Sequence, residues 1–359
     1  MKKLRLGIIG TGGIARACHI QPLLKNPEIE VVAVCDIVEA KLAQFAKEFG
    51  IKDTYLHYRD LLDRGDIDAV DICTPNYLHS TIAVDALKKG KHVFTEKPDA
   101  VSVEEVMKMQ KTAAESGKIL MVMRNNRYRP DTQFLKKYIT TGHLGQIYAA
   151  KCGWIRRRGI PGAGGWFTTK AQSGGGPLID LGVHMIDVTM WMMGSPRPVS
   201  VVGSSFSKFS QNTATPDSVH SGFGEKKAGG IFDVEDMAMG FIKFDNGACL
   251  SIEFSWASNV ENEDAYFELL GDKAGAKSHW GAPLKIFSET NGTLIDSTPL
   301  LPNTNPEIGQ HGLNLYHFAN CVLHGEAPDF VPQQGVDMIK ILTAIYKSAE
   351  TGKEITLEK

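Results

Sequence analysis

The sequence predicts an α/β protein with two domains: a doubly wound Rossmann domain on a parallel sheet, followed by a second, sheet-based domain. Three observations predict it. Apolar segments of strand length alternate with helical patterns up to about residue 124. A glycine-rich turn follows the first strand, and strand-like segments dominate after residue 199. The chain of 359 residues is also long enough for two cores.

The first part of the chain has the element order of a parallel sheet. Its second apolar segment, Val31-Val32-Ala33-Val34, is continuous rather than alternating, which is typical of strands buried on both faces. Ser102, with Glu105 three residues later, is a helix-capping signature. We expect strands over 4–9, 30–35, 69–73, 92–95 and 119–123, and helices over 13–24, 39–49, 79–89 and 103–116.

The pattern changes after residue 124, so we expect domains at 1–124 and 125–359. Asn246-Gly247 predicts a hairpin with a type I′ turn. Residues 210–230 are rich in Ser, Thr and Gly and predict a long loop. The elements expected here are helices at 131–140, 177–193, 313–323 and 336–350, and strands at 147–154, 199–205, 237–244, 248–256 and 265–270. An arrangement in which the last helix, 336–350, packs back on the first domain stays open.

Composition excludes several classes of function. The formal net charge is -2 without a block of like charges, so neither a nucleic-acid surface nor a polybasic membrane patch is predicted. No apolar stretch has the length of a membrane span. None of the six cysteines forms a C-x-x-C pair, which favours reduced, buried thiols over disulfides or a metal site. We therefore expect a cytoplasmic protein without a metal, a nucleic-acid partner or a membrane partner.

The first turn has the pattern of a dinucleotide-binding motif, G-x-G-x-x-A. Gly10 permits a tight turn, Gly12 lets the backbone approach a pyrophosphate, and Ala15 allows close packing of helix and strand. The helix that follows presents its first amides to the phosphates. The predicted contacts are Gly10, Gly12, Gly13, Ile14 and Ala15.

Asp36 ends the next predicted strand, 21 residues after Ala15. A carboxylate there can accept the ribose hydroxyls of NAD and would repel the 2′-phosphate of NADP. Ile37 and Val38 offer no compensating cation. NAD is therefore favoured over NADP as the cofactor.

Two constellations carry candidate catalytic groups. Lys97, in Thr95-Glu96-Lys97-Pro98, follows a parallel strand, where it could stabilise a developing alkoxide; the alternative is an ordinary surface lysine. Asp180 and His184 are four residues apart on one predicted helix after the glycines at 174–176, which would leave the helix start open to a ligand. His184 suits proton removal from an alcohol. The alternative is a structural His–Asp pair on a packing helix.

The chain resembles the Gfo/Idh/MocA oxidoreductases over nearly its whole length, through motifs in that family's order. These are Gly10-x-Gly12-x-x-Ala15, Cys73-Thr74-Pro75-Asn76-Tyr77-Leu78-His79, Glu96-Lys97-Pro98, and Gly-Gly-Gly-x-x-x-Asp180-x-Gly182-x-His184-x-x-Asp187. The resemblance implies that the second domain is α+β, with a large open, mixed and mostly antiparallel sheet. That sheet is implied to join subunits into a homodimer or homotetramer.

The resemblance also implies the site. Lys97, Asp180 and His184 match the catalytic trio, and the implied substrates are sugars, sugar derivatives and cyclitols. The implied cofactor contacts are Thr74, Pro75, Asn76, His79, Glu96 and Lys97, with Asn125 and Trp166 expected to join them. The substrate contacts that we expect are Lys97, Arg124, Tyr128, Arg156, Asp180, His184 and His317.

Two features depart from the family pattern or stand apart from it. Family members often have Arg at the position after the tryptophan, whereas this chain has Phe167 after Trp166. Phe167 cannot take over the role of that Arg. The basic stretch around Arg156 is either a solvated strand end or a substrate contact.

We hypothesise reversible oxidation of a ring secondary alcohol by NAD. His184 would remove the proton, Lys97 would stabilise the oxygen, and Asp180 would position His184. Two alternatives stay open. One is transient oxidation with retained NAD, which would give glycoside cleavage or epimerisation. The other is a non-catalytic sugar sensor on the same fold.

Overall fold

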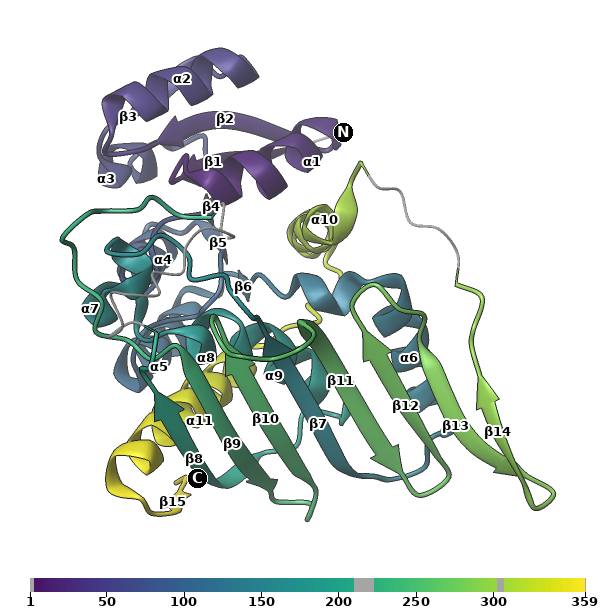
Figure 1. Ribbon diagram of the computed structural model, residues 1–359. Helices are drawn as coiled ribbons and strands as arrows, with labels where there is room; N and C mark the ends of the chain where they lie inside the picture. The colour runs from purple at the N-terminus through teal and green to yellow at the C-terminus, as the bar shows by residue number, and fades with distance from the viewer. Residues whose placement is uncertain (1–2, 210–222, 302–306, 359) are drawn as a thin grey trace. The chain divides into compact units, whose positions relative to one another are not determined.

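The computed structural model describes residues 3–209, 223–301 and 307–358, which divide into two compact units (Figure 1). Unit 1 contains Met1–Tyr128 and Thr304–Ile339, and unit 2 contains Arg129–Asn303 and Lys340–Lys359. Most of the loop expected at 210–230 lies outside the described residues. Helix α10 (Gly309–His324) belongs to unit 1, where it packs on β1 and β5, although the expected boundary assigned it to the second domain.

Unit 1 is built on a six-stranded sheet in the order β3-β2-β1-β4-β5-β6, and all its strand pairs are parallel. The Rossmann expectation is confirmed. The strands are β1 (Leu4–Ile9), β2 (Ile29–Cys35), β3 (Asp53–Tyr55), β4 (Ala69–Ile72), β5 (His92–Thr95) and β6 (Leu120–Val122). The sequence did not predict β3, because it is only three residues long and polar. The strand order reverses between β1 and β4, and ligands of such sheets bind at the carboxyl ends there.

The helix after the glycine turn begins at Gly13, as expected, but contains a π-helical turn over Ala15–His19. Ser102 caps α5 as expected, because its hydroxyl accepts a hydrogen bond from the Glu105 amide at 3.2 Å. The helices of unit 1 are η1 (Ala15–His19), α1 (Ile20–Lys25), α2 (Glu39–Phe49), α3 (Tyr58–Leu62), η2 (Asn76–Leu78), α4 (His79–Lys88), α5 (Val103–Ser116), η3 (Asn125–Tyr128) and α10. Helix α11 (Pro332–Thr351) crosses the division, since residues up to 339 group with unit 1 and later ones with unit 2.

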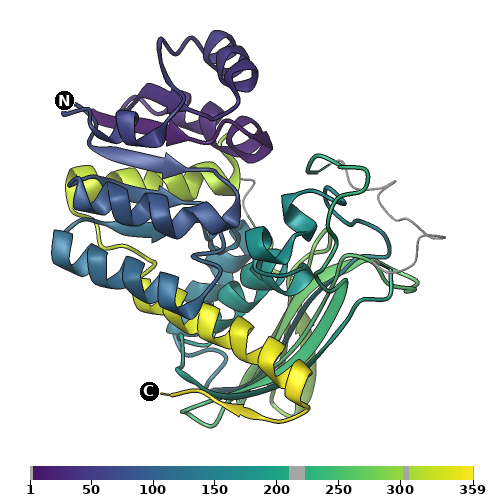
Figure 2. The ribbon, with the colours of Figure 1, turned by 90° about the vertical axis from the view of Figure 1, so that its left-hand side faces the viewer.

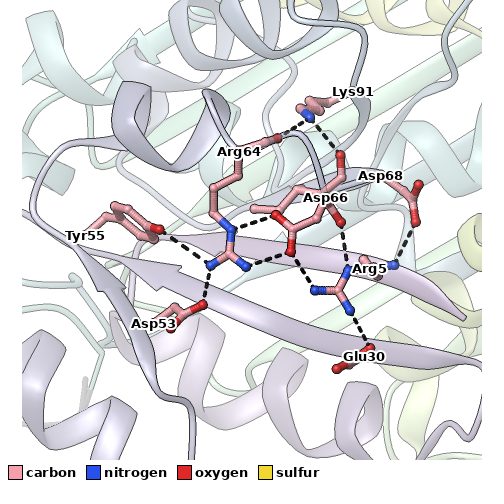
Figure 3. Close-up of polar contacts among 9 residues, drawn as sticks. Arg5, Glu30, Asp53, Tyr55, Arg64, Asp66, Asp68 and Lys91 are labelled. Atoms are coloured by element: carbon pink, nitrogen blue, oxygen red, sulfur yellow. Dashed lines mark hydrogen bonds and ion pairs between the residues drawn. The ribbon is translucent and has the colours of Figure 1, made fainter.

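A network of charged side chains joins β1, β2, β3 and the loop before β4 (Figure 3). Asp66 accepts from Arg5 at 2.6 Å and from Arg64 at 2.8 Å. These two hydrogen bonds hold the pKa of Asp66 well below its usual value. Arg5 also pairs with Glu30, and Arg64 with Asp53, so the short β3 edge is tied to the rest of the sheet.

Unit 2 is built on a nine-stranded sheet in the order β14-β13-β12-β11-β7-β10-β9-β8-β15. Only β7 and β10 pair in parallel within this sheet, so the expected mixed, mostly antiparallel sheet is confirmed. The strands are β7 (Ile147–Ile155), β8 (Pro198–Phe206), β9 (Met237–Phe244), β10 (Cys249–Ser255), β11 (Asp264–Gly271), β12 (Ala274–His279), β13 (Lys285–Thr290), β14 (Thr293–Ser297) and β15 (Ile355–Thr356).

The hairpin predicted at Asn246-Gly247 joins β9 and β10, but its turn type was predicted wrongly. Only Gly247 has a positive φ, of 84°, whereas a type I′ turn needs positive φ at both central residues. A type I′ signature occurs instead between β13 and β14, where Asn291 and Gly292 have φ of 52° and 76°.

The helices of unit 2 lie on one side of its sheet (Figure 2), and α8 and α9 pack directly on its central strands. They are α6 (Pro130–Thr140), η4 (Trp166–Thr168), α7 (Lys170–Ser173), α8 (Pro177–Asp180), α9 (Gly182–Met192) and the later part of α11. The single helix expected over 177–193 is interrupted at Leu181. The other side of the sheet exposes large apolar side chains on β8 and β9, namely Val202, Phe206, Met239 and Phe241.

Among the described residues, no helix combines the length and the apolar character needed to cross a membrane.

Candidate functional site

The glycine turn between β1 and its helix has the geometry that the motif predicts. Gly10 has a φ of 97°, and a Cβ there would lie 2.6 Å from the carbonyl oxygen of Cys73. This is a close backbone approach that only glycine permits. In contrast, among the described residues no atom from outside the turn and its own helix lies within 4 Å of the Cβ position of Gly12 or Gly13. The backbone here is therefore open to an approaching group, and Ala15 is fully buried against the sheet.

Asp36 is held beside this turn at the end of β2. Its Oδ2 accepts from the amide and the hydroxyl of Thr11, each at 2.9 Å, and its Oδ1 accepts from the Val38 amide at 2.9 Å. The carboxylate is half-buried, and Ile37 next to it is 82% exposed. The structure thus fixes an anionic acceptor beside the glycine turn.

Two of the buried polar atoms that have no hydrogen-bond partner within the described part of the chain belong to predicted cofactor contacts at the carboxyl edge of the sheet. They are Thr74 Oγ1, after β4, and Asn125 Oδ1, after β6. Buried polar atoms are nearly always bonded, so these two indicate that a ligand completes the site. Both belong to the predicted cofactor contacts. With the open glycine backbone, they fit a dinucleotide along this edge.

His79, a predicted cofactor contact, has backbone partners at both ring nitrogens. Its Nδ1 lies 2.7 Å from the Pro98 carbonyl oxygen, and its Nε2 lies 2.8 Å from that of Thr74. The side chain is completely buried. It therefore joins the segment after β4, which also carries Pro75 and Asn76, to the segment after β5.

A buried cluster that the sequence analysis missed lies beside the Glu96-Lys97 segment. His19 Nδ1 is 2.8 Å from Asp71 Oδ2, and His19 Nε2 is 2.9 Å from Glu96 Oε1. The Cys73 sulfur lies 3.4 Å from the same Nδ1. Glu96 Oε2 in turn accepts from the Lys97 amide at 3.1 Å. The π-helical turn ends at His19, and such turns often occur at functional sites.

Burial and neighbouring charges act in opposite directions on the pKa values of this cluster. Burial disfavours the imidazolium of His19, but Asp71 raises the pKa of His19 well above its usual value. Burial likewise disfavours the Glu96 carboxylate, but the hydrogen bond from His19 and its charge lower the pKa of Glu96 to about 2. Burial lowers the pKa of His311 to about 4, so this neighbouring imidazole is neutral. Lys97 itself is half-buried.

In unit 2, Asp180 and His184 lie on two short helices joined at Leu181, and both are half-buried. Trp256 Nε1 donates to Asp180 Oδ2 at 2.9 Å. The His184 ring lies 6.0 Å from the ring of Trp154. The indole of Trp256 thus fixes the Asp180 carboxylate at the end of α8.

The glycine run before α8 is filled by protein groups, contrary to the expectation that it is open to a ligand. A Cβ on Gly175 would lie 2.0 Å from the Tyr346 hydroxyl, and one on Gly176 would lie 2.0 Å from the Glu235 carbonyl oxygen. Glu235 accepts from the amides of Gly176 and Leu178, and from the Tyr346 hydroxyl at 2.8 Å. Burial raises the pKa of Glu235. The sequence did not predict these contacts of Glu235, because no motif near Glu235 or Tyr346 in the sequence indicates them.

Several expected substrate contacts already have protein partners. Arg124 forms a buried ion pair with Asp99 at 2.6 Å. His317 Nδ1 lies 3.1 Å from Glu326, and its ring lies 6.1 Å from that of Tyr128. Burial raises the pKa of Tyr128. These placements favour roles within unit 1.

Two further expected contacts lie in unit 2. The Arg156 guanidinium lies over Trp154, 5.0 Å from the ring centre, and Arg156 is half-buried. Trp166 stacks on Phe167 with ring centres 3.8 Å apart. Both side chains therefore lie against aromatic rings. The ring that Arg156 contacts, that of Trp154, is also a neighbour of His184.

The Rossmann sheet, its open glycine turn and the second, mixed sheet define a two-domain oxidoreductase with a dinucleotide site. Comparison with family models agrees. Residues 4–124 match the Gfo/Idh/MocA oxidoreductase family, NAD-binding Rossmann fold, and residues 136–357 match the C-terminal alpha/beta domain of that family. The chain belongs to the Gfo/Idh/MocA oxidoreductases, and it is a dehydrogenase with an NAD-binding domain.

Named relatives match the chain over its full length. It is 34% identical to D-glucoside 3-dehydrogenase of Escherichia coli over 99% of this chain and 97% of the relative. It is 27% identical to scyllo-inositol 2-dehydrogenase (NAD(+)) of Bacillus subtilis, over 99% and 97%. Levoglucosan dehydrogenase in complex with NADH has the same fold, with a TM-score of 0.87 at 23% identity and complete coverage of both chains.

Proposed function

We propose that this protein oxidises a ring secondary alcohol of a sugar, a sugar derivative or a cyclitol, reversibly, with NAD as hydride acceptor. The observation that carries the proposal is the placement of Lys97. It lies at the carboxyl end of β5, directly after a carboxylate whose orientation the buried cluster fixes. A cation at the cofactor edge of a Rossmann sheet suits an oxygen that gains negative charge. The names of the full-length relatives support the substrate class.

Lys97, His184 and Asp180 each have a separate role in the proposed reaction. Lys97 stabilises the alcohol oxygen as its proton leaves. His184 takes that proton, and Asp180, fixed by Trp256, orients His184 or a neighbouring hydroxyl. NAD, when bound, supplies the hydride acceptor. Thr74, Asn125 and the backbone at Gly12 would hold the dinucleotide.

Asp36 supports NAD rather than NADP. Its carboxylate is fixed by Thr11 and Val38, so it cannot simply turn away from a 2′-phosphate. The exposed apolar Ile37 beside it supplies no charge to offset the repulsion.

Two properties of the whole protein complete the proposal. The apolar side of the unit 2 sheet supports a homodimer or homotetramer. The six cysteines, all unpaired, fit the proposed cytoplasmic location.

The test uses purified protein, NAD and a panel of glycosides, free sugars and inositols, with NADH absorbance as the readout. We expect turnover by the wild type and a loss of at least about 100-fold in kcat for Lys97→Met and His184→Asn. The affinity for NAD should stay within a few-fold. Unchanged turnover in both variants would overturn the assigned roles, and no turnover by the wild type on any member of the panel would overturn the function.

A further inference from the structure

We propose that His19 is a positioning residue for Lys97. It connects the helix of the dinucleotide turn, through the Glu96 carboxylate, to the backbone amide of the catalytic lysine. The inference rests on the proposed function in one respect, since it takes Lys97 as the group that meets the substrate oxygen.

The connection is a continuous series of short contacts within unit 1. Asp71 on β4 holds His19 Nδ1 at 2.8 Å, and His19 Nε2 holds Glu96 Oε1 at 2.9 Å. The other oxygen of Glu96 accepts from the Lys97 amide at 3.1 Å. The side chains of His19 and Asp71 are completely buried, and that of Glu96 is 7% exposed. Because Glu96 is held at both oxygens, the start of the Lys97 turn has little freedom.

The geometry of the helix that carries His19 supports the contact between His19 and Glu96. The π-helical turn over Ala15–His19 inserts extra backbone into the helix that starts at the glycine turn. His19 is its last residue, and its ring makes an edge contact with Phe94 of β5 at 6.5 Å. A movement of this helix when a dinucleotide binds would therefore reach Lys97 through His19 and Glu96.

The charges around His19 favour an imidazolium that donates at both nitrogens. In the part of the chain that the structure describes, six titratable groups lie around His19. They are Asp71 on β4, Cys73 directly after β4, Glu96 and Lys97 directly after β5, Cys18 on the same helix as His19, and His311 on α10. The lowered pKa of Glu96 keeps its carboxylate negative, while the thiol of Cys73 and the His311 ring are neutral. The carboxyl groups of Asp71 and Glu96 on either side of His19 therefore favour its protonated form.

A metal site is the weaker interpretation of the same residues. Ligand atoms of His19, Asp71 and Cys73 lie within 4.8 Å of one another. However, an ion would have to break the 2.8 Å contact between His19 and Asp71 and would leave Glu96 without its partner. The positioning role keeps the contacts of His19 with both Asp71 and Glu96.

The experiment compares wild type with His19→Gln and His19→Leu. The control is Leu62→Ala, a buried change on α3 of the same unit. Four quantities are measured: NAD affinity by fluorescence, kcat and KM for the best sugar of the panel, and the acetic anhydride labelling rate of Lys97 relative to the exposed Lys88, without NAD.

We expect kcat to fall at least tenfold in His19→Leu and less in His19→Gln, whose amide can still donate to Glu96. KM and NAD affinity should stay within threefold, and Lys97 should be labelled several-fold faster. The control should change none of the four. A kcat within twofold of wild type in both variants, or unchanged Lys97 labelling, overturns the proposal.

A separate measurement keeps the test decisive if the variants do not fold. In the wild type, ¹⁵N NMR of the His19 ring should show Nε2 protonated at pH 8, as the contact with Glu96 requires, and an unprotonated Nε2 there overturns the proposal. If the wild type turns over no sugar, the proposed function fails, while labelling and NMR still decide the role of His19.

Discussion

At the scale of single residues, the site depends on carboxylates that are fixed by short hydrogen bonds. Asp36 is held by Thr11 and Val38, Glu96 by His19 and the Lys97 amide, and Asp180 by Trp256. Hydrogen bonds to charged groups are stronger than neutral ones and fix geometry as well. Two predictions belong to this scale.

The first concerns cofactor choice. Replacing Asp36 with Ser removes the negative charge that faces a 2′-phosphate and an acceptor for the ribose. We expect NAD affinity to fall roughly 10- to 100-fold, since hydrogen bonds to charged groups contribute about 1.5–3 kcal/mol. The ratio of NADP to NAD affinity should rise. Titration of both cofactors checks this, with Glu39→Gln on the exposed start of α2 as control; an unchanged ratio would contradict it.

The second concerns pH. The pKa of Glu96 is lowered from 4.5 to about 2 in the fold, so its charge stabilises the protein above pH 4.5, and this contribution is lost as the pH falls towards 2. His19 has a raised pKa, so its contribution is complete below 6.5 and is lost only as the pH rises through the raised value. The Glu96 contribution is the one that an acid titration tests.

The measurement is urea unfolding of wild type and Glu96→Gln between pH 7 and pH 3. Wild type should be more stable than the variant at neutral pH, and the difference should shrink below pH 4.5. A difference that is independent of pH over this range would show that Glu96 is not held as a carboxylate.

At the scale of elements, two glycine segments that look alike in sequence have opposite environments. The backbone of Gly12 faces open space, whereas Gly176 faces the Glu235 carbonyl oxygen. One segment is open to a ligand, and the other is closed by Glu235 and Tyr346, which fix the start of α8.

A matched pair of substitutions tests this difference. Gly12→Ala should leave the free energy of unfolding nearly unchanged and weaken NAD binding by at least about tenfold. Gly176→Ala should destabilise the protein by about 1–3 kcal/mol, because a backbone atom lies 2.0 Å from the new Cβ. Thermal unfolding and NAD titration separate the two. Equal effects of both changes on stability would be evidence against the distinction.

At the scale of the whole molecule, the proposed assembly rests on the apolar side of the unit 2 sheet. Val202, Phe206, Met239 and Phe241 are between 36% and 46% exposed and lie on paired positions of β8 and β9. Contiguous apolar surface of this kind is typical of subunit interfaces.

Introducing charged side chains on that surface tests the assembly. We expect wild type to be a dimer or tetramer by light scattering, and Met239→Glu with Phe241→Lys to shift it towards monomer. Met107→Lys, at an exposed apolar position on α5, is the control and should change nothing. A monomeric wild type would contradict the proposed assembly.

Much of this protein was predictable from short windows of sequence. Strand β1 and helices α2 and α5 have the expected bounds, and the glycine turn has the expected open backbone. Local periodicity, caps and turn residues encode such features directly. The Asn-Gly turns show the limit of this, because the same dipeptide gives a type I′ signature in one hairpin and a different turn in the other.

Only the tertiary structure decided which polar residues meet. His19 and Glu96 are 77 residues apart in sequence, and Glu235 and Tyr346 are 111 apart. No pattern within one element predicts either contact, because each depends on how β-strand order and helix packing bring distant segments together. The sequence by itself determined a Rossmann domain with Asp36 and Lys97 at its cofactor edge. The fold determined that Lys97 lies next to a buried cluster of charged side chains. Carboxylates and imidazoles are stable in such a buried position only when each has a hydrogen-bonding or charged partner.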